Sequence, residues 1–263
     1  MGIPRSSFYY RPKLQDESKV ENAILEVAGA WPVYGYRRIT AQLRREDWNI
    51  NHKRVYRIMQ KMGLQGQIKR KKRYTTNSKH HYKRFPNLIK EKTIYRPDQV
   101  WASDITYVRL KRGFVYLAVI VDVFTRCVRG WHLSHDLDQG LTLTALDKAL
   151  EKGKPEIHHS DQGLQYAARE YINTLQNAGV RISMTDRGAA WQNGHVERLI
   201  RTIKEEEVDL TEYQDYWDAY RQICRFLEDV YMHKRIHSSL DYLTPVEYET
   251  SWLKQRSAAH VFS

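Results

Sequence analysis

Three carboxylates stand out in this 263-residue chain because of the segments that carry them. Asp104 lies within VWASDITYV, a β-branched and aromatic run where a charge is unexpected unless a site uses it. Asp161 ends the predicted strand IHHS, and Glu197 lies in HVERLIRTIK, whose apolar residues recur at helical spacing. Carboxylate oxygens are hard ligands that suit Mg²⁺ or Mn²⁺. These residue types therefore indicate metal-assisted chemistry.

Gathering three such acids in one pocket requires a compensating charge. Two unit charges about 4 Å apart repel by roughly 4 kcal/mol at an effective dielectric constant of about 20. A pair of divalent cations is the simplest compensation for three carboxylates. Each acid taken alone is explained at least as well as an unrelated surface or turn residue, so the hypothesis rests on the three together.

The elements that must position these acids follow an α/β order. We predict strands at 101–108, 114–122 and 127–133, a helix at 138–150, a strand at 156–160, a helix at 166–178, a strand at 180–184 and a helix at 194–207. On the last of these helices the apolar stripe has Glu197 at its edge. Its members are Val196, Leu199, Ile200 and Ile203.

The motifs around the three acids resemble those of a known family. Asp104, then HHSDQG, then thirty-five residues between Asp161 and Glu197 in NGHVERLIRTIKEE, are similar to the D, D(35)E signature of bacterial insertion-sequence transposases in the retroviral-integrase superfamily. The likeness is to the second-reading-frame product of the insertion-sequence-three family. It extends from GIPRSSFYY to HSSLDYLTPVEYE, with mild departures near His233 and Ile236.

This resemblance implies a ribonuclease-H-like integrase catalytic core at 98–210, in which Asp104 and Asp161 lie on neighbouring strands. It implies two ions, Mg²⁺ or Mn²⁺, bridged by Asp104, with Asp161 and Glu197 each holding one. Lys204, about two helical turns beyond Glu197, is then placed to meet DNA. Asn193, one turn before Glu197, is placed to orient that glutamate or a phosphate.

The resemblance also implies an activity and partners. The enzyme is expected to cut one strand at the terminal inverted repeats of an insertion sequence and to join it to the other end or to target DNA. Synapsis of two ends implies a homo-oligomer. GIPRSSFYY resembles the end of a recognition region encoded upstream, which suggests an upstream-encoded partner or fusion.

Two other functions remain open from the residues. One is a ribonuclease-H-like nuclease that hydrolyses DNA without strand transfer. The other is a non-catalytic DNA-binding regulator derived from a transposase, although retention of all three acids disfavours it.

Charge is distributed unevenly along the chain, whose formal net charge is +12. Residues 1–97 carry 23 Lys and Arg against 7 Asp and Glu, whereas the remainder carries 20 against 24. The basic excess thus lies wholly in the N-terminal third, which is typical of a phosphate-binding module joined to a near-neutral one. Double-stranded DNA is the expected partner.

Residues 1–64 form the predicted small α-helical domain of helix-turn-helix type. A helix at 16–30 precedes YGYRRITAQLRRE and WNINHKRVYRIMQKMGL, which have the pattern of two short helices. Their polar faces are expected to contact the major groove, although a solvated charged face is the alternative. The candidate DNA contacts are Arg37, Arg38, Lys53, Arg54 and Arg57.

Residues 65–97 are predicted to be a basic linker that follows the phosphate backbone, with a flexible tether as the equal alternative. Its basic cluster consists of Lys69, Arg70, Lys71, Lys72 and Arg73. Residues 211–263 are predicted to be a C-terminal helical extension containing a helix at 213–232. In its closing motif, packing is favoured over DNA contact for Arg235 and His237.

The remaining features of the sequence exclude some functions. Cys127 and Cys224 are expected to be buried inert thiols, and they are too few for a CxxC-type zinc site. No apolar run approaches the length of a membrane span, so a cytoplasmic, nucleoid-associated protein is expected.

Asp122 is interpreted as a turn or strand cap, and Asp186 belongs to a loop suited to a mobile flap over DNA. His158 and His159 alternate along a strand, so at most one can face the site.

Overall fold

A computed structural model describes residues 17–64, 84–186 and 189–261. The chain divides into two compact units, Met1–Ile68 and Lys69–Ser263. Among the described residues no helix is both long and apolar enough to cross a membrane. The predicted DNA contacts at Lys69, Arg70, Lys71, Lys72 and Arg73 lie outside the described residues.

The N-terminal unit contains three helices within residues 17–64, and they enclose one small core. They are α2 (Ser18–Ala30), α3 (Tyr36–Arg45) and α4 (His52–Lys61). Asn51 caps α4, accepting a hydrogen bond from the backbone N–H of Lys53, as its residue type predicts. The core side chains include Ile24, Ile39, Leu43, Val55 and Ile58, each fully buried. The predicted helical fold of this unit is confirmed.

The second unit is built on a five-stranded sheet in the order β3-β2-β1-β4-β5. Its strands are β1 (Val100–Arg109), β2 (Phe114–Asp122), β3 (Val128–Ser134), β4 (Ile157–Ser160) and β5 (Arg181–Met184). The first three are antiparallel, whereas β4 runs parallel to β1, and β5 runs parallel to β4. The predicted ribonuclease-H-like α/β order is confirmed, with strand bounds shifted by at most one residue.

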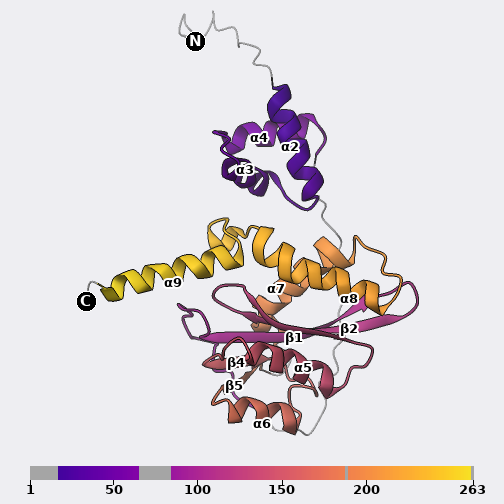
Figure 1. Cartoon of the computed structure of the whole chain (residues 1–263), viewed down its shortest axis with the longest axis vertical. Coiled ribbons are helices and arrows are strands. Elements are labelled where there is room, and N and C mark those ends of the chain that lie inside the picture. Colours follow the sequence, from indigo (N-terminus) through magenta and orange to yellow (C-terminus); the bar gives the residue numbers. More distant parts are fainter. Residues whose placement is uncertain (1–16, 65–83, 187–188, 262–263) are drawn as a thin grey trace, which may run out of the picture. The chain divides into compact units, whose positions relative to one another are not determined.

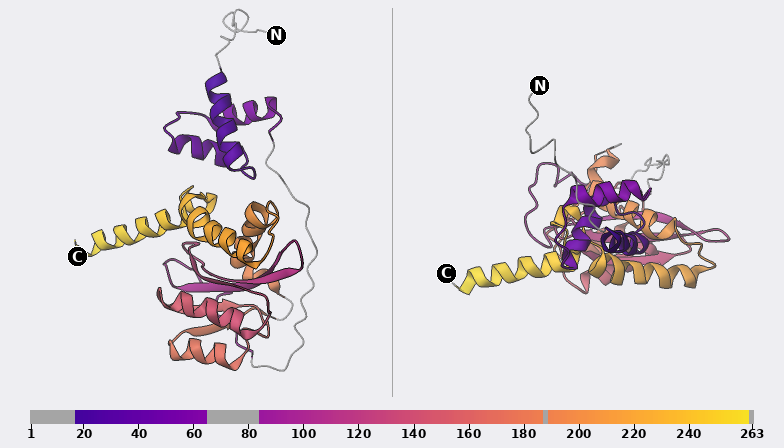
Figure 2. Two further views of the ribbon diagram at one scale, coloured as in Figure 1. Left: turned by 45° about the vertical axis from the view of Figure 1, so that its right-hand side comes forward. Right: turned by 90° about the horizontal axis from the view of Figure 1, so that it is seen from above.

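Helices cover both faces of this sheet, and separate hydrophobic cores lie under them (Figure 1, Figure 2). On one face are α5 (Gln139–Leu150) and α6 (Arg169–Asn177); on the other are α7 (Gly194–Ile203) and α8 (Tyr216–Arg225). Side chains along β1 alternate between these two cores. Trp101 packs in the core under α5 and α6, and Ala102 packs in the core under α7 and α8. Asp104 has the same parity as Ala102, which places it on the face that α7 covers.

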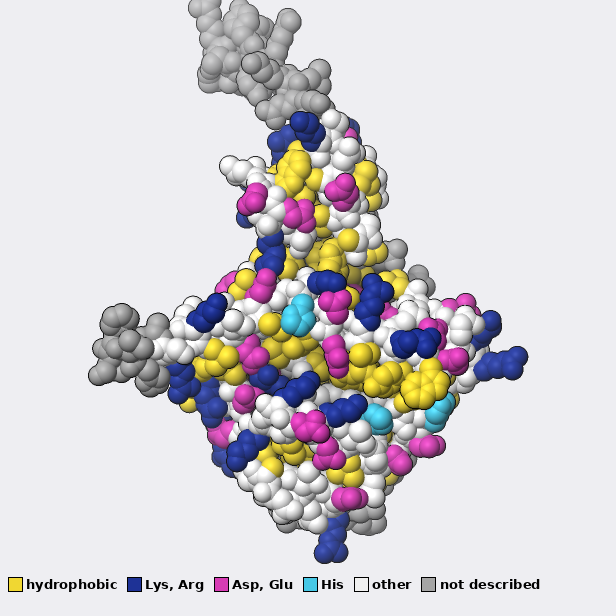
Figure 3. Space-filling view, in the orientation of Figure 1, with side chains coloured by type: hydrophobic (Ala, Val, Ile, Leu, Met, Phe, Trp, Pro, Cys, Tyr) yellow, Lys and Arg dark blue, Asp and Glu magenta, His cyan; other side chains and the backbone are white. Residues whose placement is uncertain are grey.

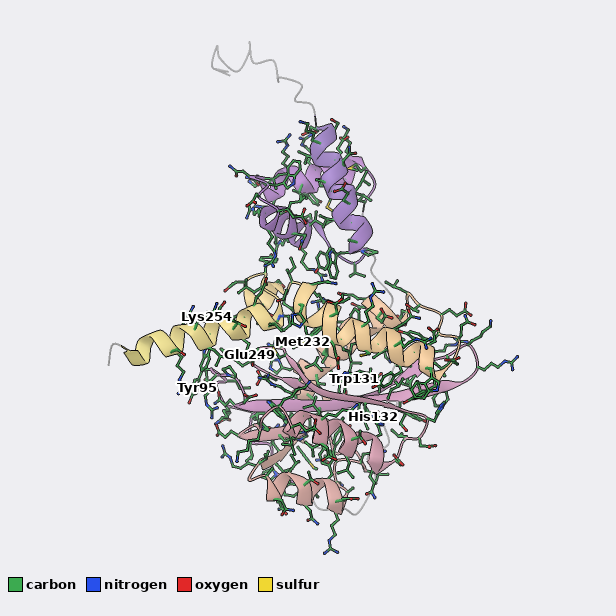
Figure 4. All side chains as sticks on the ribbon, in the orientation of Figure 1. Tyr95, Trp131, His132, Met232, Glu249 and Lys254 are labelled. Atoms are coloured by element: carbon green, nitrogen blue, oxygen red, sulfur yellow. The ribbon has the colours of Figure 1, made fainter. Side chains whose placement is uncertain are left out.

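The helices after α7 pack onto that same face, so part of residues 211–263 shares the core of the sheet. Ile223 and Leu227 are fully buried there with Val119 and Leu133. The elements between and beyond the α-helices are η1 (Ala190–Asn193), η2 (Lys204–Val208), η3 (Phe226–Lys234), η4 (Ser238–Leu240) and α9 (Pro245–Val261). Arg129 of β3 pairs with Glu249 of α9, which is labelled in Figure 4.

Candidate active site

The sheet register brings the two aspartates together. Strands β1 and β4 pair in parallel, and the last matched residues are Ser103 and Ser160. Asp104 and Asp161 each follow that pair by one residue. Because neighbouring strands lie about 4.8 Å apart, the backbones of Asp104 and Asp161 lie next to each other at this end of the strand pair. The pairing of β1 with β4 therefore places two acids side by side that are far apart in sequence.

The pKa of Asp104 is also consistent with the proximity of Asp161. Burial raises the pKa of its carboxyl group to about 7, and repulsion from Asp161 and then Glu197 adds to that rise. A hydrogen bond from the backbone N–H of Ile105 (2.8 Å) and the positive charge of Lys204 oppose it. Asp161 and Glu197 thus each lie within electrostatic reach of Asp104, and Lys204 shares its surroundings.

A tight turn after β4 holds Asp161. Its Oδ1 accepts a hydrogen bond from the backbone N–H of Gly163 at 2.9 Å. A Cβ at position 163 would lie 2.9 Å from that same oxygen, so any other residue there would crowd the carboxylate. The glycine in HHSDQG therefore serves the close approach of the backbone to Asp161.

Glu197 is positioned by the packing of α7 on β1. Val196, Leu199, Ile200 and Ile203 are buried on that helix, and Glu197 lies partly exposed at the margin of this stripe. Burial raises the pKa of Glu197, while Arg201, one turn on, lowers it. The predicted helical stripe is confirmed.

Asn193 fastens the start of α7 to the sheet. Its side chain is only 3% exposed, and its Nδ2 donates to the backbone oxygen of Ser103 at 3.0 Å. Ser103 directly precedes Asp104, so this hydrogen bond links the strand of one carboxylate to the helix of another. A role for Asn193 in DNA contact stays a prediction.

Lys204 lies just beyond α7 and faces the outer part of β1. Its Nζ is 4.1 Å from the centre of the Tyr107 ring, which is a cation–π contact. The contact places the ammonium group three residues along β1 from Asp104.

The donor set fits hard divalent cations in chemistry and in charge. Within residues 17–64, 84–186 and 189–261, no three His, Cys, Asp or Glu side chains are gathered closely enough to hold a metal ion. One oxygen of Asp104 and one of Asp161 instead accept the backbone hydrogen bonds described above. The mutual repulsion that raises the pKa of Asp104 is the feature that a cation would relieve.

This repulsion predicts a pH-dependent stability for the metal-free protein. Folded Asp104 keeps its proton up to about pH 7, whereas an unfolded aspartate loses it near about pH 4. Between these values the folded state binds more protons, so its free energy of unfolding falls as pH rises. Asp104→Asn should flatten this fall, gaining a few kcal/mol relative to wild type at pH 8. Urea unfolding in EDTA at pH 5 and pH 8 measures this, and parallel changes in the two proteins would contradict it.

Two other acids of the core, Asp122 and Asp186, form hydrogen bonds within the fold. Asp122 is fully buried, and its Oδ1 accepts from the backbone N–H groups of Phe124 and Thr125. The interpretation of Asp122 as a turn cap is thereby confirmed. Asp186 is exposed and exchanges hydrogen bonds with Gln192.

The two histidines of β4 are both buried within the sheet. His158 bonds with the Tyr171 hydroxyl at 3.0 Å, and His159 bonds with Ser183 Oγ at 2.8 Å. Burial lowers the pKa of His158 to about 3 and that of His159 to about 4, so both are neutral at pH 7.

The basic side chains of the N-terminal unit have varied surroundings. Lys53 and Arg37 are exposed. Arg54 and Arg57 both pair with Glu17, which precedes α2. Arg38 donates to the backbone oxygen of Val33 and lies over the ring of Tyr34. These placements leave the predicted DNA contacts as predictions.

Two arginines of the catalytic core make contacts that no pattern in the sequence signalled. Arg126, in the turn after β2, bonds with Nδ1 of His195 at 2.6 Å, two residues before Glu197. Arg129 pairs with Asp98 at 2.9 Å and with Glu249. Both arginines join segments far apart in the chain, and only the folded structure reveals such partners.

The sheet order, with acids following β4 and within β1 and a third on the crossing helix, defines an integrase-type core of the ribonuclease-H-like class. One solved structure of similar fold is a chain of the simian T-cell lymphotropic virus intasome in complex with PP2A regulatory subunit B56 gamma. It has a TM-score of 0.52 and 15% identity, covering 86% of this chain and 74% of that one. Family models described as integrase core domain match residues 94–190 and 178–245, and one described as HTH-like domain matches residues 15–72.

Curated relatives narrow this class to one family. The transposase for insertion sequence element IS904 of Lactococcus lactis subsp. lactis is 35% identical, over 82% of this chain and 87% of its own length. The putative transposase InsK for insertion sequence element IS150 of Escherichia coli is 33% identical, over 94% and 89%. The chain therefore belongs to the insertion-sequence transposases, enzymes of the DDE type, as its motifs predicted.

Proposed function

We propose that Asp104, Asp161 and Glu197 are the catalytic carboxylates of this transposase and that they hold two divalent ions, Mg²⁺ or Mn²⁺. The single observation that carries this proposal is the parallel register of β1 and β4, which sets Asp104 beside Asp161, and the raised pKa of Asp104 agrees with it. Asp161 and Glu197 are far from Asp104 in sequence, and holding both within electrostatic reach of it destabilises the metal-free fold. Phosphoryl transfer supplies a reason for this arrangement.

Each residue of the candidate site has a proposed role in phosphoryl transfer. Bound cations would neutralise charge on the scissile phosphate and activate water or a DNA 3′-hydroxyl for in-line attack. Asp104, which both other acids repel, would hold the ions together with Asp161 and Glu197. The backbone N–H of Gly163 orients Asp161, while the packing of α7 orients Glu197. Lys204 adds a positive charge beside the phosphate.

We infer that the substrate is double-stranded DNA, with terminal inverted repeats and target DNA as the two classes. The test is incubation of the purified chain with candidate end DNA and Mg²⁺, scoring nicked and joined products separately. Nicked and joined products together support strand transfer. Nicks alone favour the nuclease alternative, and neither product with bound DNA favours the regulator.

The N-terminal unit supplies the proposed DNA-recognition surface. Replacing Lys53, Arg54 and Arg57 together by alanine should weaken duplex binding and reduce the salt slope by about 0.9 for each phosphate that is no longer neutralised. Glu17→Gln should shift binding the other way, because Glu17 pairs with both arginines. Fluorescence anisotropy at several salt concentrations measures both. An unchanged slope in the triple variant would place the DNA-binding surface elsewhere.

Joining two transposon ends requires that both ends be held together, so we also propose a homo-oligomer that assembles on DNA. An upstream-encoded partner or fusion remains an expectation from the resemblance. Nucleoid association follows from DNA binding and remains part of the proposal.

A further inference from the structure

The outer part of the β1–β2 hairpin exposes aromatic rings to water. Tyr107 is 51% exposed and Phe114 is 55% exposed, although large aromatic side chains usually lie in cores. Tyr107 lies opposite Tyr116, and Arg109 lies opposite Phe114, so all four share one face of the hairpin. The rings of Phe114 and Tyr116 meet edge to face at 5.4 Å.

Positive charge surrounds these rings. Arg109, Lys111 and Arg112 are exposed at the end of the hairpin, and residues 105–116 contain no acid. Lysine and arginine side chains project at the right-hand margin of Figure 3, where the hairpin turns. The neighbouring segment contributes Gln214, which accepts from Nζ of Lys111 at 3.1 Å. Exposed Glu212 and Asp215 belong to that segment too, so the excess of positive charge is that of the hairpin itself.

By the alternation along β1, this aromatic and basic face lies on the side of the sheet opposite to Asp104, where Tyr116 packs against the core under α5 and α6. Tyr107 follows Asp104 by three residues, which is about 10 Å along a strand. Strand β4 pairs with β1 only as far as Ser103, so the described part of β4 does not cover the edge of β1 beyond that residue. Lys204 lies over the Tyr107 ring and connects the two regions. A DNA strand at the carboxylates would reach the rings by passing around this uncovered edge of β1, over a few nucleotide steps of about 3.4 Å each.

We propose that this face of the hairpin binds unpaired nucleotides of the DNA strand next to the scissile phosphate. The inference rests on the proposed function of the carboxylates. Bases stack on Tyr107 and Phe114, while Arg109, Arg112 and Lys204 contact the phosphates. Stacking needs an open base face, which a paired duplex offers only at its end, so the occupant is single-stranded DNA. The combination of rings and cations matches such a strand in both chemistry and charge.

The test compares two DNAs on the full-length chain in EDTA. One is a blunt fluorescent duplex, and the other is the same duplex with a short oligo-dT extension. Because the N-terminal unit meets the same duplex in both, the ratio of the two affinities isolates the effect of unpaired bases. Tyr107→Ala and Phe114→Ala should each lower that ratio at least about fivefold. Tyr107→Phe, which retains the ring, should recover most of it.

Two controls separate stacking from other effects. Phe114→Ala leaves the Tyr107 ring that contacts Lys204 in place, so its effect cannot come from that cation–π contact. Tyr95 is 64% exposed at the opposite end of β1 and is labelled in Figure 4. Tyr95→Ala should leave the ratio unchanged.

An unchanged ratio in both alanine variants would overturn the proposal. So would an unchanged ratio accompanied by a shift in oligomeric state on size-exclusion chromatography, which would assign the surface to a protein partner. The cleavage assay with Mg²⁺ stands apart from this measurement. Its failure counts against the catalytic proposal, whereas the binding ratio tests the hairpin alone.

Discussion

Replacing Asp104 or Asp161 by asparagine, or Glu197 by glutamine, is expected to lower Mg²⁺-dependent DNA cleavage by roughly a thousandfold or more. Each change removes a charged metal ligand while keeping side-chain size. Loss of about 4 kcal/mol of transition-state stabilisation corresponds to a factor of that order. Single-turnover cleavage of end DNA measures the effect.

Binding of the same DNA provides the control for these variants. Affinity should stay close to that of the wild type, because the proposed recognition surface lies in the N-terminal unit. Asp136→Asn, which changes an exposed acid after β3, should retain cleavage. Any carboxylate variant that still cleaves at the wild-type rate would remove that residue from the site.

The second large effect concerns stability. Arg235 and Glu206 form a two-pronged ion pair at 2.6 and 2.7 Å, with only 5% and 6% of their side chains exposed. The pair joins the closing motif of the chain to η2, next to Lys204. Removing one partner leaves the other charge buried, which costs about 3–5 kcal/mol. Arg235→Met or Glu206→Gln should lower the free energy of unfolding by that amount in urea titrations.

Two comparisons make this expectation specific. The double variant Glu206→Leu with Arg235→Met should recover much of the lost stability, since neither charge is then stranded. The pair between Lys234 and Asp229 is exposed, so Lys234→Met should cost less than about 1 kcal/mol. Equal losses for Lys234→Met and Arg235→Met would show that burial does not set the effect.

Much of the catalytic core could be predicted because its elements have strong periodic signals. The alternation in 101–108 and the helical stripe around Glu197 were sufficient to place two of the carboxylates on the correct elements. Their convergence could be expected only through the family resemblance, since strand pairing between β1 and β4 depends on contacts more than fifty residues apart.

Local irregularities were harder to predict. Helix α6 begins at Arg169 and not at 166, because Tyr166 and Ala167 donate their backbone N–H groups to Gly163 in the turn after Asp161. Segments η2 and η3 are π-helical, and apolar spacing does not distinguish this geometry from an α-helix. The helix α9 (Pro245–Val261) was expected only as part of a helical extension without bounds.

Charged partners were the least predictable feature. A run of arginines predicts a basic surface, but it does not reveal that Arg54 and Arg57 share Glu17. Likewise Arg235 was expected to pack, which is confirmed, but its partner Glu206 was not anticipated. Ion pairs between distant segments depend on tertiary geometry that residue types alone do not encode.

Iron-mediated cleavage of the polypeptide tests most directly whether the three acids form one metal site. Fe²⁺ substituted for Mg²⁺, with ascorbate and peroxide, generates hydroxyl radicals that cut the backbone close to the bound ion. We expect cuts near Asp104, near Asp161 and near Glu197 together, all suppressed by excess Mg²⁺ and by Asp104→Asn. Cuts confined to one of these segments, or unaffected by Asp104→Asn, would contradict a shared site.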